Sequence, residues 1–227
     1  ERKKPLTLQD YFIDTGMSKE DVERIISVGD PITRERQLIE MGDCVNSKSI
    51  DNRVSVFILI ELLKRMKDQK PAIDTYAVFT VQEEVGLRGA TVAASGIDPD
   101  FTIALDTTIA NDLPGFKAHE SVTKLGDGAA IKILDGSILC DTRMVRFMKG
   151  QAQNAEIPFQ MEILPAGGTD TGAMQRFAKG GSIAGAISIP TRYLHQVIEM
   201  AHKKDIKHCI ELLEKCVINL DQGDWEF

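Results

Sequence analysis

Apolar and polar positions along the chain alternate between a strand-like and a helix-like pattern. Runs rich in β-branched and aromatic residues predict strands at 75–82, 101–106, 129–134, 159–164 and 182–189. Apolar residues at three- and four-residue spacing predict helices at 54–67, 87–95, 140–153, 170–179 and from 206 onward. Strands that alternate with helices predict an α/β fold, a sheet covered by helices on both faces, in which 75–106 forms one βαβ unit.

Two helical segments have distinct patterns. The apolar stripe of 54–67 is too wide for a surface helix, which predicts a helix that packs on the sheet. A shorter helix at 18–25 is expected at the periphery, with Ser18 as its N-cap and Asp21 at the capping-box position.

Composition narrows the classes of function. The 227 residues are 43% hydrophobic and 27% charged, which suits one medium domain, or one domain with an appendage. A net charge of -7 without a basic stripe argues against nucleic acid as a partner. The longest apolar runs are about half of the ~20 residues that a membrane span requires, so no membrane partner and a cytoplasmic location are expected. Four cysteines lack Cys-x-x-Cys spacing and are expected to be reduced core residues.

Acids stand at the ends of several apolar runs. Glu83 and Glu84 follow strand 75–82 directly, Asp106 closes the next strand, and Asp51 precedes the helix at 54–67. Ligands of open α/β sheets bind beyond the carboxyl ends of the strands, so these acids are expected to converge. Each acid alone also fits a helix cap or a solvated loop residue. Together they are costly unless a cation compensates their charge, which predicts a metal site.

A nitrogen ligand is available at His195, which follows the strand 182–189 and Pro190. The alternative for His195 is a partly buried histidine bonded to a backbone carbonyl. Carboxylates with an imidazole suit zinc, cobalt or manganese. Where the chain turns after residue 82, one glutamate can bind the metal while its neighbour acts as general base on a metal-activated water. Surface roles are expected for the remaining histidines, His119, His202 and His208.

Six segments in order, "SIDNR", "TVQEEVGLRGA", "IALDTTIANDLPG", "LGDGAAIKILDGS", "GGTDTGA" and "PTRYLH", resemble the cytosolic di-metal aminopeptidases of metallopeptidase family 42. This family includes glutamyl aminopeptidases and tetrahedral, dodecameric aminopeptidases. The resemblance implies that Asp51 bridges two divalent metal ions, zinc, cobalt or manganese, and that Glu84 binds one of them. It implies that Asp106 and His195 bind the other ion and that Glu83 is the general base. A cis peptide between Asp51 and Asn52 is also implied.

The resemblance further implies a zinc-aminopeptidase (phosphorylase/hydrolase-like) catalytic domain with a mixed sheet. Residues 1–45 would be the tail of an inserted β dimerisation domain with its return segment, and 46–227 the catalytic domain. The family has a further histidine ligand in an N-terminal stretch that has no counterpart here. The chain therefore resembles the last two thirds of a member, and by itself it is expected to be inactive. Short peptides are the implied substrates, and a homo-oligomer, a dodecamer in the intact protein, is the implied assembly.

A metallo-aminopeptidase is a hydrolase and a protease. Two alternatives to this function stay open. One is a glycan-hydrolysing enzyme with Glu83 and Glu84 as its acids, although glycosidase carboxylates flank a bond and lie ~5–9 Å apart. The other is a non-catalytic subunit, because the N-terminal histidine ligand is absent. The glycine-rich segment 167–173 is expected to line the substrate pocket, with Asp170 as helix N-cap. Absence of Gly-x-Ser-x-Gly and His-Glu-x-x-His argues against an α/β-hydrolase and a thermolysin-like protease.

Overall fold

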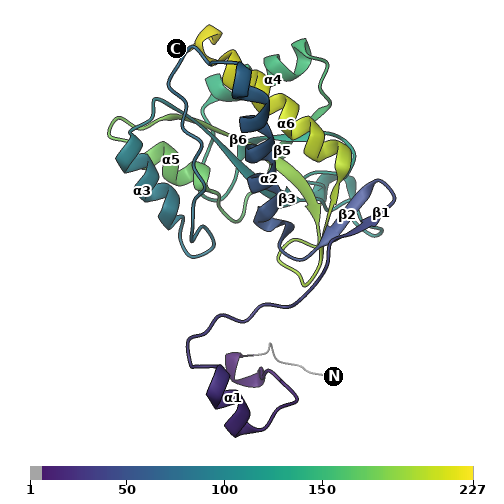
Figure 1. Cartoon of the computed structure of the whole chain (residues 1–227). Helices are drawn as coiled ribbons and strands as arrows, with labels where there is room; N and C mark the ends of the chain where they lie inside the picture. Colours follow the sequence, from purple (N-terminus) through teal and green to yellow (C-terminus); the bar gives the residue numbers. More distant parts are fainter. Residues whose placement is uncertain (1–6, 227) are drawn as a thin grey trace. The chain divides into compact units, whose positions relative to one another are not determined.

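The computed structural model describes residues 7–226 (Figure 1). The chain divides into two compact units, Glu1–Glu35 and Arg36–Phe227. The first contains the short helices η1 (Leu8–Asp10) and α1 (Lys19–Ile25), and no residue of α1 is buried. The Ser18 hydroxyl accepts the Asp21 N–H at 3.2 Å and donates to the Asp21 carboxylate at 2.7 Å, which confirms the predicted N-terminus of α1.

The second unit is built on a mixed sheet of seven strands. The strands are β1 (Ile39–Met41), β2 (Cys44–Ser47), β3 (Phe101–Ile109), β4 (Ala129–Leu134), β5 (Phe159–Ile163), β6 (Ile183–Arg192) and β7 (Glu199–His202). Their order is β1-β2-β7-β6-β4-β5, and β3 pairs with β6. The β3–β6 and β4–β5 pairs are parallel, and the other pairs are antiparallel. The predicted mixed α/β sheet is confirmed.

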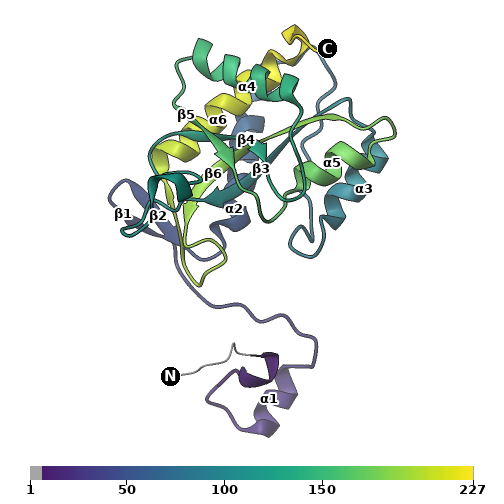
Figure 2. The same cartoon turned by 180° about the vertical axis from the view of Figure 1, so that it is seen from behind.

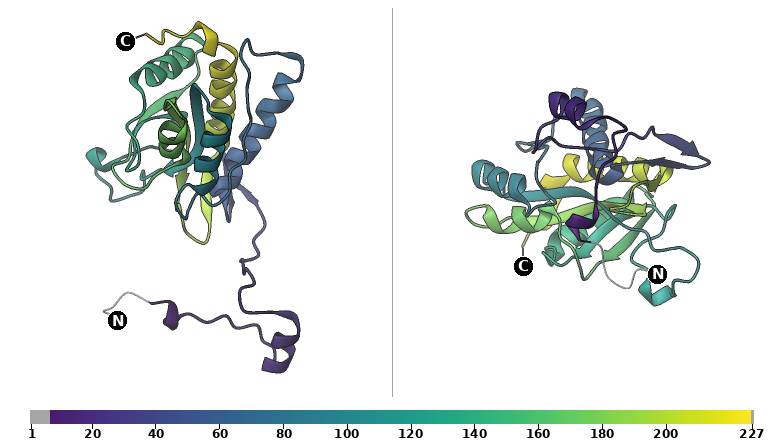
Figure 3. Two further views of the ribbon diagram at one scale, coloured as in Figure 1. Left: turned by 90° about the vertical axis from the view of Figure 1, so that its left-hand side faces the viewer. Right: turned by 90° about the horizontal axis from the view of Figure 1, so that it is seen from below.

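Helices cover both faces of this sheet. They are α2 (Ile50–Arg65), α3 (Arg88–Ile97), α4 (Thr142–Asn154), α5 (Asp170–Phe177) and α6 (Lys203–Ile218), with the short η2 (Met66–Asp68), η3 (Ala118–Glu120) and η4 (Leu220–Gln222). Eight consecutive residues of β6, 184–191, are buried, which requires cover on both sides because successive side chains point to opposite faces. Helices α2 and α6 pack together on one side (Figure 3), and α3 packs against α5 (Figure 2). Among the described helices, none is long and apolar enough to cross a membrane.

The wide apolar stripe of α2 is only partly used in packing. Val54, Ile58 and Leu62, at four-residue spacing, are buried in the main core with residues of α4, α6 and the sheet. Phe57 and Leu63 on the same helix remain 49% and 47% exposed. The prediction of a helix on the sheet therefore holds for one face of α2, while the rest of its apolar stripe faces outward.

The strand predicted at 75–82 is wrong. This segment is extended, but it joins no sheet ladder within residues 7–226. Tyr76, Phe79 and Val81 are 66%, 48% and 69% exposed, so their β propensity is not matched by a neighbouring strand. Its last residues instead meet the start of α3, where the Gly89 N–H donates to the Val81 carbonyl at 3.0 Å. The expected βαβ unit is therefore absent, although its helix and its second strand are present.

Candidate metal centre

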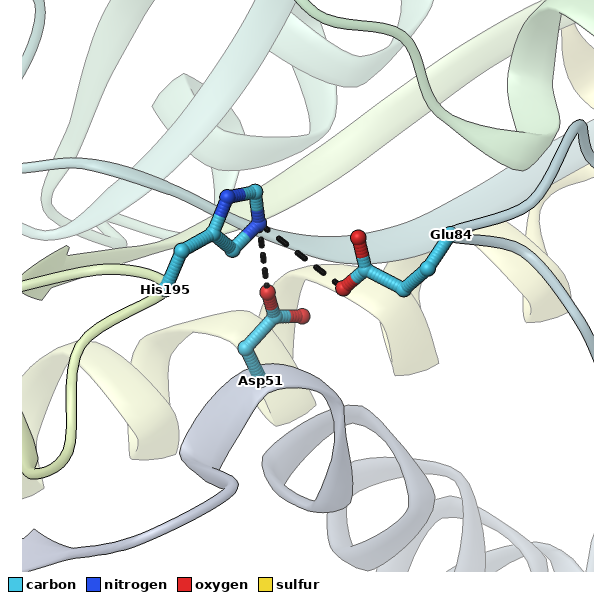
Figure 4. A group of neighbouring side chains, drawn as sticks. All are labelled: Asp51, Glu84 and His195. Atoms are coloured by element: carbon cyan, nitrogen blue, oxygen red, sulfur yellow. Dashed lines mark ion pairs between the residues drawn. The ribbon is translucent and has the colours of Figure 1, made fainter. Parts of the chain in front are cut away.

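Three side chains from distant parts of the sequence meet at one point of the second unit. Asp51, Glu84 and His195 each offer one ligand atom, and these atoms all lie within 4.8 Å of one another (Figure 4). The Nε2 atom of His195 lies 3.1 Å from Asp51 Oδ2 and 3.7 Å from Glu84 Oε1. The side chains of Glu84 and His195 are 63% and 64% exposed, whereas that of Asp51 is 9% exposed. The group is therefore anchored in the protein and open to solvent on one side.

Each of the three lies where regular structure is interrupted. Asp51 is in the first turn of α2, where its ψ of 110° is not helical, and the Asp51–Asn52 peptide is cis, as the family resemblance implies. Glu84 lies in a turn in which the Leu87 N–H donates to the Glu83 carbonyl at 2.9 Å. His195 has a φ of 60° in the turn between β6 and β7.

Asp106 lies beside this group at 8% exposure, on β3. Its Oδ1 accepts hydrogen bonds from Asn52 Nδ2 and from the Thr107 N–H, both at 2.8 Å. Burial, followed by the negative charges of Asp51 and Glu83, raises the pKa of Asp106 well above its usual range. Asn52 also donates to the Leu105 carbonyl at 3.2 Å, so it ties the start of α2 to β3.

Several acids lie close together at this point, and burial together with their mutual repulsion raises the pKa values of Asp51 and Glu83. Burial raises the pKa of Glu83 to about 7, and the charges of Glu84, Asp170 and Asp51 add to the effect. Burial also raises the pKa of Asp51 to about 6, followed by the charges of Glu84 and Glu199. The imidazole of His195 opposes both shifts. A cation at this point would favour the ionised acids.

The donor set fits a divalent transition metal. Two carboxylates and one imidazole converge, a further carboxylate lies beside them, and zinc, cobalt and manganese accept this combination of oxygen and nitrogen ligands. The structure therefore brings together the five predicted site residues. The ligand atoms of three of them are in direct proximity, and Asp106 and Glu83 interact with the group through their charges.

Two acids near the site have roles that the sequence analysis did not identify. Asp170 is the first residue of α5, and Thr169 is its N-cap, so the predicted N-cap is wrong by one residue. Asp170 accepts a hydrogen bond from the Thr80 hydroxyl at 2.5 Å and raises the pKa of Glu83, which places the glycine-rich segment near that glutamate. Glu199 accepts hydrogen bonds from the backbone N–H groups of Asp51 and His195. The signal available in the sequence is an acid four residues after His195. The sequence alone does not show that the turn between β6 and β7 brings this acid to the backbone of His195 and Asp51.

The remaining histidines lie elsewhere. His119 is exposed and lies near Glu120 in η3. His202 is the N-cap of α6, where its Nδ1 accepts the Lys204 N–H at 3.2 Å. His208 lies within α6 and is partly buried.

Known proteins resemble this chain over 78% to 96% of its length. The aminopeptidase APDkam598 of the archaeon Desulfurococcus kamchatkensis superposes with a TM-score of 0.92 at 38% identity, covering 96% of this chain and 62% of its own. The TET1 peptidase of Pyrococcus horikoshii can assemble into a tetrahedron or a large octahedral shell. It superposes with a TM-score of 0.81 at 29% identity, covering 96% of this chain and 64% of its own. The lysyl aminopeptidase of Pyrococcus furiosus is 34% identical over 177 residues, 78% of this chain and 49% of its own.

This chain is shorter than the proteins it matches. It spans 59% to 64% of three curated relatives from Acetivibrio thermocellus and Escherichia coli, which are 30% to 40% identical to it. The profile of one family, described as M42 glutamyl aminopeptidase, matches residues 1–212. The chain belongs to the M42 glutamyl aminopeptidase family.

Proposed function

We propose that the whole protein is a metal-dependent aminopeptidase that hydrolyses the N-terminal peptide bond of short peptides. The observation that carries this proposal is the convergence of Asp51, Glu84 and His195, with Glu83 beside them at a raised pKa. A solvent-open group of metal-binding side chains next to an acid that titrates near neutral pH is suited to hydrolysis. Membership of an aminopeptidase family supports the choice of substrate.

The residues that would hold metal are Asp51, Glu84, Asp106 and His195. The proposed ions are two divalent cations in the intact protein, zinc, cobalt or manganese, with Asp51 shared between them. Bound metal would polarise the substrate carbonyl and lower the pKa of water. In residues 7–226 the direct ligand cluster holds three residues, so we expect this chain by itself to bind one metal ion or none.

Glu83 is the proposed general base. Its half-buried carboxylate accepts a proton more readily than an exposed glutamate, because its pKa lies at about 7. At neutral pH such a group can take a proton from the attacking water and return it to the leaving amine. The nearby Asp170 belongs to the segment 167–173, which we propose lines the substrate pocket.

Assembly into a homo-oligomer is part of the proposal. It is supported by the TET1 peptidase, described both as a tetrahedron or octahedral shell and as a dodecamer. The glycan-hydrolase alternative has weaker support: Glu84 lies in the ligand group, so it would not be free to act as one of two acids flanking a glycosidic bond. A non-catalytic subunit is disfavoured because Asp51, Glu84 and His195 converge and Glu83 and Asp106 lie near enough to interact with Asp51 through their charges.

A panel of aminoacyl-nitroanilides tests the proposal. The whole protein is loaded with zinc, cobalt or manganese, and its metal content is measured. Each substrate is then assayed. We expect release of nitroaniline from at least one N-terminal residue type and none from N-acetylated substrates. Absence of hydrolysis across the panel in protein shown to contain two metal ions would contradict the proposal.

A further inference from the structure

Glu199 joins two of the ligand residues through its carboxylate. Its Oε2 accepts the Asp51 N–H at 2.9 Å, and its Oε1 accepts the His195 N–H at 3.1 Å. We propose that Glu199 is a positioning residue, which fixes the backbone of Asp51 and of His195 relative to each other so that their side chains converge. The proposal rests on the metal-binding role of these two residues.

Sheet register explains how one side chain reaches both segments. Glu199 is the first residue of β7 and lies opposite Ser47, the last residue of β2, in the antiparallel β2–β7 pair. The chain passes from Ser47 into the first turn of α2, which carries Asp51. On its other side, Glu199 directly follows the turn that carries His195. It is therefore the point at which the two ligand-bearing segments come together.

A carboxylate is the side chain suited to this position. Glu199 is 3% exposed, and an ionised carboxylate is an acceptor on both oxygens, so it can satisfy two N–H donors at once. Neither donor is in a regular ladder. His195 holds a left-handed φ of 60°, a conformation that is unfavourable for a non-glycine residue and persists only where its surroundings fix it. The hydrogen bond from Glu199 provides such a constraint at the residue whose ring faces Asp51.

A second buried acid makes the same type of contact away from the site. Asp205, in the first turn of α6, is 0% exposed, and its two oxygens accept the N–H groups of Gly126 and Gly128 at 2.7 and 2.9 Å. Its replacement removes a buried carboxylate that accepts two backbone N–H groups of one loop, without touching Asp51 or His195. Asp205→Asn is therefore a matched control for Glu199→Gln.

The experiment compares wild type, Glu199→Gln and Asp205→Asn in two ways, at a temperature where each variant is folded. The first readout is the set of backbone amide resonances of metal-free protein, and the second is the dissociation constant for Co²⁺ from its visible absorption. In Glu199→Gln one N–H donor faces an amide NH₂, so we expect the Asp51 and His195 amide resonances to move. We expect the Co²⁺ dissociation constant to rise at least about tenfold, the usual effect of losing an outer partner of a ligand. Asp205→Asn should leave both readouts unchanged even where it lowers the melting temperature.

Three outcomes would overturn the proposal. The first is a Co²⁺ dissociation constant in Glu199→Gln within twofold of wild type, and the second is an equal weakening in Asp205→Asn. The third is rapid hydrogen exchange of the Asp51 or His195 amide in the wild-type protein, a measurement that decides the matter even where Glu199→Gln does not fold. If wild type binds no Co²⁺, an outcome that the three-residue ligand cluster allows for this chain by itself, the amide resonances and exchange rates alone decide whether the Glu199 contacts hold.

Discussion

Two clusters of acids are built on the same sheet, and they differ in how their charge is balanced. In the first cluster, Lys132 on β4 is 1% exposed and forms ion pairs with Glu162, which is 0% exposed, and with Asp135 at 3.6 Å; its charge also opposes the rise in the pKa of Asp106. In the ligand group, the only basic side chain of residues 7–226 within ion-pair distance of Asp51 and Glu84 is the imidazole of His195, which is 64% exposed.

The two clusters differ in whether the carboxylates are paired with a basic side chain and hydrogen-bonded within the protein. Around Lys132 the carboxylates receive additional hydrogen bonds: Thr108 donates to Glu162 at 2.7 Å, and Thr169 donates to Asp135 at 2.9 Å. These pairs and hydrogen bonds compensate the buried charge within the protein; at Glu162 they all fall on Oε1, and within residues 7–226 its buried Oε2 has no hydrogen-bond partner. In the ligand group, burial and neighbouring negative charges raise the pKa values of Asp51 and Glu83. We propose that a bound cation compensates this charge.

The largest expected effect concerns activity and distinguishes the role of Glu83 from that of Glu84. In the whole, metal-loaded protein, Glu83→Gln should lower kcat by about 10²–10⁴-fold, because a neutral amide cannot accept the water proton. Its metal content should stay close to that of wild type. Glu84→Gln, which changes a ligand, should instead weaken metal binding. Steady-state kinetics with elemental analysis measure both, and equal metal loss in the two variants would reverse or remove these assignments.

The second prediction breaks the balanced cluster. Lys132→Met removes the buried cation and leaves Glu162 and Asp135 without it, which should lower the free energy of unfolding by about 3–5 kcal/mol. Urea unfolding followed by circular dichroism measures the change. Lys64→Met is the control, since Lys64 is an exposed partner of Glu61 and should change stability by less than about 1 kcal/mol. A loss below 1 kcal/mol in Lys132→Met would show that its ion pairs do not maintain the fold.

Neither cluster could be assigned fully from the sequence. The five site residues were identifiable because each acid ends an apolar run or precedes a helix, and because the motifs resemble a known family. The Lys132 cluster was hidden, since Lys132 lies in the apolar run 129–134 and only the burial of β4 on both faces reveals it. Glu199 was hidden for another reason: its hydrogen bonds depend on the register of β2 against β7, two four-residue strands too short to predict.

The fold was predictable where a pattern alone decides the structure. Helices α2, α4, α5 and α6 and strands β3 to β6 were predicted close to their observed bounds, because periodicity reports which face of an element is buried. Segment 75–82 has a strand-like sequence as well, but a strand also needs a hydrogen-bonded neighbour, which no local pattern reports. The predicted boundary at residue 45, between a dimerisation-domain tail and the catalytic domain, stays a prediction.

A smaller effect should follow from weakening the balanced cluster without removing a charge. Thr108 is 0% exposed, and its hydroxyl donates to Glu162 at 2.7 Å. Thr108→Val keeps the shape of the side chain but deletes this donor, so we expect a loss of about 1.5–3 kcal/mol, the value of a hydrogen bond to a charged group. Urea unfolding measures it against Thr91→Val, which removes a hydroxyl bonded to the Leu87 carbonyl on α3. Equal losses in the two variants would show that the charge of Glu162 adds nothing.

The smallest expected effect is the pH dependence of metal-free stability. The folded-state pKa of Glu83 is raised to about 7 from an ordinary value of 4.5, so the folded state holds its proton more tightly than the unfolded state. The corresponding stability is fully present below pH 4.5 and is lost as pH rises to about 7. The whole shift corresponds to about 3 kcal/mol, and solvent screening of a half-exposed side chain reduces this to about 1–2 kcal/mol.

Glu83→Gln has no carboxylate to ionise, so metal-free Glu83→Gln should be more stable than wild type at pH 8 by about 1–2 kcal/mol and should lose less stability between pH 4.5 and 7. Urea unfolding at a series of pH values measures this difference, with the exposed Glu35→Gln as control. Saturating Zn²⁺ should narrow this difference in stability, because a nearby cation favours the ionised form of Glu83 in the wild type. If the wild type and Glu83→Gln lose stability in parallel between pH 4.5 and 7, Glu83 is not one of the uncompensated charges. The contrast between the two clusters would then rest on Asp51 and Asp106 alone.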